Sequence, residues 1–141
     1  ICDEVIRRPL EEANELHDVL EKLGPGDIVF FDGSHRCLQN SDVTIFFIDF
    51  LPSIPDGVTV GIHDIFWPND YPEEWVDRYY NEQYILGAYI LGMGSQFPLR
   101  FSCMYMAINY ADQLAECLEP ELVSKLPGLG GGALWFDKKS L

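Results

Sequence analysis

The 141-residue sequence predicts an α/β fold with a mostly parallel sheet and helices on both faces. Two short apolar runs, 28–31 and 58–62, lack the alternation of half-exposed strands, which is typical of strands covered on both faces. Segments with helical spacing of apolar residues lie before, between and after them. A hydrophobic content of 48% and a charged content of 23% indicate a globular chain, which we assign to one domain over residues 1–141.

The first half of the chain alternates helix and strand. Leucine and alanine recur at three- and four-residue steps over Leu10–Leu23, which predicts a helix that ends at Gly24-Pro25-Gly26. Strand Ile28–Phe31 follows and ends in the polar turn Asp32–His35. Apolar residues over Asp42–Leu51 return to helical spacing, although their β-branched and aromatic side chains leave a strand as the alternative.

The second half continues this alternation. Strand Val58–Ile62 ends at His63-Asp64, and Pro72 with the two glutamates after it begins a helix that reaches about Leu91. A strand is predicted over Phe101–Ile108 and a helix over Tyr110–Leu118. A glycine-rich loop or hairpin turn at 128–132 then leads to a last strand, Ala133–Phe136. The two strands are expected to be antiparallel, at the edge of the sheet.

Charge and cysteine content limit the function classes. Nine basic against 23 acidic residues give a net charge of −14, which disfavours nucleic acid and anionic membrane surfaces as partners. No apolar run is long enough to cross a bilayer, and no signal peptide opens the sequence. The four cysteines are widely spaced without a C-x-x-C pair, so we expect a cytoplasmic protein.

Polar side chains follow both buried strands. The carboxyl ends of neighbouring parallel strands lie about 4.8 Å apart, and ligands bind at that edge, so we expect Asp32, His63 and Asp64 to converge. A divalent metal would relieve the repulsion between the carboxylates. His35, one turn beyond Asp32, is a candidate general base. The alternative is structural: Asp-Gly is an ordinary turn, and His-Asp can cap a helix.

An aromatic segment, Phe66–Tyr71, follows the second strand. We expect it to form a lid or acceptor wall beside the candidate site, or else to pack against the sheet edge. Glu82 and Gln83 are polar within an apolar helix and are expected to be solvated. Core or subunit packing is the expectation for the remaining aromatic residues of this region, Trp75, Tyr79, Tyr80, Tyr84 and Tyr89.

Several of these motifs together resemble the class I S-adenosylmethionine-dependent methyltransferases. The resemblance is strongest to the branch that includes macrocin O-methyltransferase-like proteins and proteins named cephalosporin hydroxylases, and it runs from about Val5 to Trp135. It implies a three-layer, Rossmann-like fold with antiparallel last strands. The motifs that carry it are Asp32–His35, Ser41-Asp42, Gly57–Ile65, Tyr71–Trp75 and Asn81–Tyr84.

The resemblance also implies a reaction and a site. The cofactor is S-adenosylmethionine, the acceptor is a small-molecule hydroxyl, and a divalent metal (Mg²⁺ or Mn²⁺) assists. Asp32, His63 and Asp64 match the metal positions, and His35 matches the base. His63 stands where the relatives carry an oxygen ligand, and an imidazole suits Mn²⁺, Fe²⁺ or Zn²⁺ better than Mg²⁺.

The cofactor motifs of the family are incomplete in this sequence. No glycine-rich strand-turn-helix precedes Ile28, so the chain resembles the C-terminal half of the fold. The resemblance leaves Leu10, Glu11 and Asp32 as the expected cofactor contacts.

Two other function classes remain open. A non-catalytic α/β interaction module would expose the apolar edge of Ile28–Phe31, and such an edge invites a homodimer. A non-haem iron oxygenase would use two histidines and a carboxylate. Because adjacent strand residues point to opposite faces, the pair His63-Asp64 disfavours that site.

Overall fold

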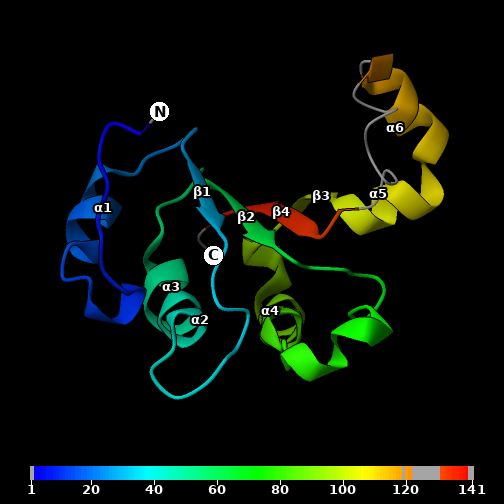
Figure 1. Cartoon of the computed structure of the whole chain (residues 1–141). Helices are drawn as coiled ribbons and strands as arrows, with labels where there is room; N and C mark the ends of the chain where they lie inside the picture. Colours follow the sequence, from blue (N-terminus) through cyan, green and yellow to red (C-terminus); the bar gives the residue numbers. More distant parts are fainter. Residues whose placement is uncertain (1, 119, 122–130, 140–141) are drawn as a thin grey trace.

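The chain forms a four-stranded mixed sheet. The computed structural model describes residues 2–118, 120–121 and 131–139, and its strand order is β1-β2-β4-β3 (Figure 1). Strands β1 (Ile28–Phe31) and β2 (Thr59–His63) are parallel, whereas β4 (Ala133–Asp137) is antiparallel to β2 and to β3 (Leu99–Ser102). The α/β class is confirmed. The sheet is mixed rather than mostly parallel, because the reversed strand β4 lies between β2 and β3 instead of at an edge.

Helices of the first half are shorter than predicted. The stretch Leu10–Leu23 contains a 3-10 turn, η1 (Leu10–Glu12), and a separate helix, α1 (Leu16–Lys22). They separate because Ala13 is extended, with φ −82° and ψ 93°.

The helix predicted for the next segment is observed, and the strand alternative is not. Helix α2 (Asp42–Ile45) continues through the π-helical turn η2 (Phe46–Phe50) into α3 (Leu51–Ser53). The Ser41 side chain accepts a hydrogen bond from the Thr44 N–H and so caps the start of α2.

The single helix predicted from Pro72 to Leu91 is wrong. Left-handed Tyr79, at φ 56°, divides the segment into the 3-10 helix η3 (Glu73–Arg78) and helix α4 (Glu82–Met93). A further 3-10 turn, η4 (Gly94–Gln96), follows α4.

The strand predicted over Phe101–Ile108 is also mostly wrong. Strand β3 stops at Ser102, whose side chain accepts a hydrogen bond from the Tyr105 N–H and begins helix α5 (Cys103–Asn109). Helix α6 (Ala111–Cys117) matches its prediction. Gly131 and Gly132 have no regular structure, and the rest of the predicted glycine loop lies outside the described residues.

The core lies between one face of the sheet and the helices. Val60, Ile62 and Phe136 from the strands are fully buried, as is Phe47 from η2. Burial of each such side chain contributes about 1.5–3 kcal/mol. In Figure 1, α2, α3 and α4 lie along the same side of the sheet, and α5 and α6 extend from its end.

The opposite face of the sheet is open. Ile28 is 65% exposed and Phe30 49% exposed, and the Phe30 ring stacks on Trp135 with centroids 5.4 Å apart. In the described part of the chain the helices thus cover one face and form two layers, not the three layers with helices on both faces that were expected.

The strand register determines where polar side chains gather. Phe31 pairs with Ile62, so Asp32 and His63 leave the sheet side by side at the carboxyl ends of β1 and β2. Among the described residues, no helix combines the length and apolar character needed to cross a membrane.

Candidate metal centre

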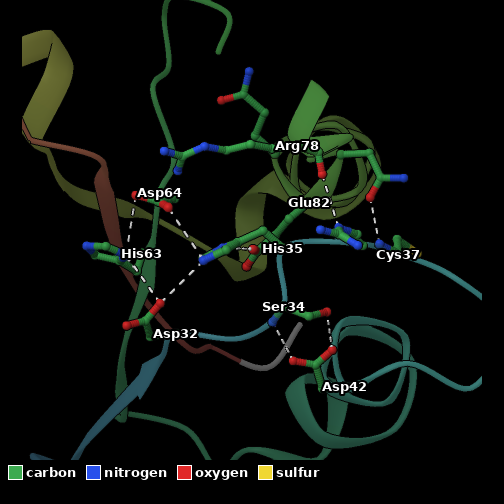
Figure 2. A network of polar contacts seen from close by, with 12 residues as sticks. Asp32, Ser34, His35, Cys37, Asp42, His63, Asp64, Arg78 and Glu82 are labelled. Atoms are coloured by element: carbon green, nitrogen blue, oxygen red, sulfur yellow. Dashed lines mark hydrogen bonds and ion pairs between the residues drawn. The ribbon is translucent and has the colours of Figure 1, made fainter. Parts of the chain in front are cut away.

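Two carboxylates and two imidazoles meet at the ends of β1 and β2 (Figure 2). The Nδ1 atom of His63 lies 3.3 Å from Oδ1 of Asp32 and 3.4 Å from Oδ1 of Asp64. The structure therefore brings together all three residues that the sequence suggested as metal ligands.

The convergence of His63 and Asp64 departs from the expected strand alternation. Strand β2 ends at His63, and Asp64 takes a left-handed backbone with φ 51°. This turn rotates the Asp64 side chain toward the same point as His63. Strand alternation would place the two side chains on opposite faces, but the strand ends at His63, and the side chains converge as expected.

His35 completes the cluster. Its Nε2 atom lies 3.5 Å from Oδ1 of Asp32 and 3.4 Å from Oδ2 of Asp64, and the residue is only 7% exposed. His35 is also left-handed, at φ 60°. Left-handed non-glycine residues cost about 1–3 kcal/mol each and gather at functional sites. Of the four left-handed non-glycine residues among those described, two, His35 and Asp64, lie in this cluster.

Gly33 and Asp42 hold the turn between Asp32 and His35. The Asp42 carboxylate accepts hydrogen bonds from the Ser34 N–H at 2.6 Å and from its hydroxyl at 2.5 Å. A Cβ at Gly33 would lie 2.5 Å from Oδ2 of Asp42, so glycine is needed for this close approach.

Glu82 is the site residue that sequence reasoning missed. The expectation that it is solvated was wrong: the residue is 0% exposed, and its Oε2 lies 2.7 Å from Nδ1 of His35. It is the first residue of α4, where the helix dipole favours a carboxylate. The available signal was the motif Asn81–Tyr84, which contributed to the family resemblance.

Gln83 is likewise buried, at 1% exposure, and the expectation that it is solvated was wrong. Its side chain accepts a hydrogen bond from the Phe66 N–H at 3.1 Å and donates one to Asp70 at 3.0 Å. Gln83 thus ties the aromatic segment to α4 beside the cluster.

Negative charge exceeds positive charge in this cluster. Burial alone would lower the pKa of His35, but the hydrogen bond and charge of Glu82, together with the charges of Asp64 and Asp32, outweigh it and raise that pKa. Burial raises the pKa of Glu82, and its contact with His35 offsets this only in part. A cation would relieve the remaining repulsion between carboxylates.

The donor atoms fit a divalent metal. One ligand atom each from Asp32, His35 and His63 lie within 4.8 Å of one another. The buried Nδ1 of His63 makes no hydrogen bond within the described part of the chain, which leaves it available as a ligand. The mixed oxygen and nitrogen donors suit Mn²⁺, Fe²⁺ or Zn²⁺ better than Mg²⁺. This set contains His35, the candidate base, but not the predicted ligand Asp64, whose carboxylate contacts both histidines without belonging to it.

A hollow of about 600 Å³ adjoins the cluster on the β1 side. Leu10, Glu11 and Asp32, the three expected cofactor contacts, all line it. Its volume lies within the range of ligand pockets, roughly 300–1,000 Å³.

The arrangement thus offers a cation site, an imidazole held by a buried carboxylate, and an adjoining hollow large enough for a cofactor. Asp32, His35 and Asp64 lie in loops that follow β1 and β2 at the carboxyl edge of the sheet, where ligands bind in open α/β folds, whereas Glu82 begins α4 and Leu10 and Glu11 belong to η1. Comparison with protein-family models, with curated proteins and with solved structures finds no match to this chain.

Proposed function

We propose that this chain carries out metal-assisted, S-adenosylmethionine-dependent methylation of a hydroxyl on a small molecule. One observation carries the proposal: Asp32 and Asp64, from the ends of two neighbouring strands, approach the same two histidines beside the hollow that Leu10 and Glu11 line. The reversed strand β4 is a second support, since the family resemblance implies antiparallel last strands.

The residues divide the chemistry between them. Asp32, His63 and Asp64 would hold the cation, which supplies a positive charge that lowers the pKa of the acceptor hydroxyl. Glu82 accepts a hydrogen bond from Nδ1 of His35, and this leaves Nε2 directed at the cluster to take the hydroxyl proton.

Glu82 also stabilises the imidazolium that forms when His35 takes the proton. Methyl transfer is an in-line displacement, so the rest of the rate gain comes from aligning the acceptor oxygen with the methyl group.

Binding and transfer measurements test this proposal. Isothermal titration of the protein containing this chain should show S-adenosylmethionine binding, and Asp64→Asn should abolish methyl transfer while binding is retained. Asp112→Asn, which removes an exposed carboxylate from α6, is the matched control. Absence of cofactor binding contradicts the proposed function, and undiminished transfer by Asp64→Asn contradicts the role of the metal.

One observation favours a second candidate, a non-haem iron hydroxylase. Asp32, His35 and His63 form a set of two imidazoles and one carboxylate, the ligand combination of Fe²⁺ oxygenases. The two functions differ in their need for oxygen. Oxygen uptake that depends on Fe²⁺ would support the hydroxylase, whereas methyl transfer that proceeds without oxygen supports the methyltransferase.

A further inference from the structure

A second hollow, of about 240 Å³, lies beside η3. Aromatic side chains make up most of its wall, and they were expected to pack in a core or at a subunit contact. Tyr79 is 74% exposed and Tyr84 52% exposed, so neither of these two packs in the core of the chain. The aromatic pocket is lined by Tyr71, Trp75, Tyr79, Tyr80 and Tyr84, together with the carboxylates of Asp70 and Glu73.

The rings of the aromatic pocket stand at nearly right angles to one another. Tyr80 makes interplanar angles of 77° with Tyr71 and 82° with Trp75, and Tyr71 makes an angle of 88° with Tyr84. The ring centroids in these pairs are 5.6–5.9 Å apart. Edge-to-face contact at these distances is the ordinary packing of aromatic pairs, and the electronegative face of a ring that lines the hollow attracts a cation.

The chain itself places a cation against this group of rings. The guanidinium carbon of Arg78 lies 3.8 Å from the centroid of Trp75 and 5.7 Å from that of Tyr80. Arg78 is not among the residues that line the hollow, but its positive charge lies against two of the wall rings and opposes part of their attraction for a second cation.

Negative charge at the pocket adds to the attraction of the rings. Asp70 accepts hydrogen bonds from the Tyr84 hydroxyl at 2.6 Å, the Tyr71 N–H at 2.7 Å and the Gln83 amide at 3.0 Å. These bonds, that of Tyr84 first, hold the pKa of Asp70 below its usual value, so the carboxylate is ionised. None of the lining residues is a lysine or arginine, and the carboxylates of Asp70 and Glu73 favour a cationic ligand over an anionic one.

The aromatic pocket adjoins the metal centre through Tyr80. The Tyr80 ring lines the pocket, and its centroid lies 4.6 Å from that of His35. We propose that the aromatic pocket binds an organic ammonium group and, resting on the proposed function, that this group belongs to the methyl acceptor, an amino alcohol. The hydroxyl of such an acceptor then extends past Tyr80 toward His35.

Binding of choline tests the pocket without metal or S-adenosylmethionine. Isothermal titration should show that choline binds about tenfold more tightly than 3,3-dimethylbutan-1-ol, its neutral isostere, because only the charged ligand gains the cation–π attraction. Quenching of tryptophan fluorescence, with Trp75 in the pocket wall, is a second readout. Equal affinity for the two ligands would overturn the proposal.

Two neighbouring glutamates provide a matched pair of variants. Both are exposed, and Glu73 lines the pocket whereas Glu74 does not. We expect Glu73→Gln to weaken choline binding about threefold or more and Glu74→Gln to leave it unchanged. Tyr79→Leu removes an exposed ring from the wall and should weaken binding further. Equal effects of the two glutamate variants, or no effect of Tyr79→Leu, would contradict the pocket.

The outcome separates this inference from the proposed function. If the protein binds choline more tightly than the neutral isostere but does not bind S-adenosylmethionine, the aromatic pocket is supported and the methyltransferase function is rejected. If the protein transfers methyl groups but binds choline and the isostere equally, the methyltransferase function is supported and the aromatic pocket is rejected.

Discussion

Replacement of Glu82 by alanine removes the buried partner of His35, and we expect a destabilisation of about 3–5 kcal/mol. The two side chains are 2.7 Å apart and are 0% and 7% exposed, so bulk solvent does not hydrate this pair in the folded protein. A hydrogen bond to a charged group contributes about 1.5–3 kcal/mol, and an unsatisfied buried donor costs a further ~1–3 kcal/mol. Glu82→Gln keeps the side-chain volume and an acceptor, so a loss of only about 1–2 kcal/mol is expected.

The pH dependence of this effect has a defined sign. The pKa of His35 is raised in the folded protein, so its contribution to stability is complete below the unfolded value of 6.5 and is lost as the pH rises through the folded pKa. The pKa of Glu82 is also raised in the folded protein, so its contribution to stability is complete below the unfolded value of 4.5 and is lost as the pH rises through the folded pKa. Glu82→Gln removes the carboxylate, and with it both pH-dependent contributions to stability: the raised pKa of His35 and the titration of Glu82 itself. The difference in stability between wild type and variant therefore shrinks as the pH rises.

Urea unfolding followed by tryptophan fluorescence, at about pH 5.5 and about pH 8.5, measures this difference. Glu74→Gln, an exposed substitution with the same change of charge, is the control and should show no comparable pH dependence. A Glu82→Gln effect that is the same at both pH values would refute the assigned His35–Glu82 coupling. So would a loss below about 1 kcal/mol in Glu82→Ala.

Three further substitutions probe the fold by urea unfolding. Phe47→Ala, at a side chain with 0% exposure, should cost about 3–5 kcal/mol, and a loss under ~1 kcal/mol would contradict its place in the core. Gly61→Val should cost about 1–3 kcal/mol, because a Cβ there lies 2.5 Å from the Trp135 ring; an unchanged midpoint would contradict that packing. Burial raises the pKa of Asp137, but hydrogen bonds, that of Arg100 first, lower it overall. Its stabilisation is therefore present above the unfolded value of 3.8 and lost as the pH falls through the folded pKa. Asp137→Asn should cost about 0.5–1 kcal/mol near neutral pH and less in acid; the opposite trend would contradict the assignment.

Strands β1 and β2 were predictable because their signal is local. The apolar runs of β1 and β2 have no alternation, and the structure places them as adjacent parallel strands. The helix boundaries were not predictable from apolar spacing. Left-handed Tyr79 and extended Ala13 interrupt stretches whose side-chain periodicity continues, and periodicity carries no information on such backbone changes.

The candidate site was predictable only in part. Asp32, His63 and Asp64 follow strands directly, so the rule for open α/β sheets locates them. Glu82 was not predictable in this way, because its partner His35 lies 47 residues away in the sequence. A polar residue in an apolar helix indicates a solvated position when only its own helix is considered, and the buried hydrogen bond depends on the tertiary fold.

Anomalous diffraction from a crystal grown with Mn²⁺ tests the central claim most directly. We expect one strong anomalous peak in contact with the carboxylate of Asp32 and the imidazole of His63, and its loss in Asp32→Asn crystals. A crystal without a peak at this cluster, or a peak that persists there in Asp32→Asn, would contradict the metal centre on which the proposed function depends.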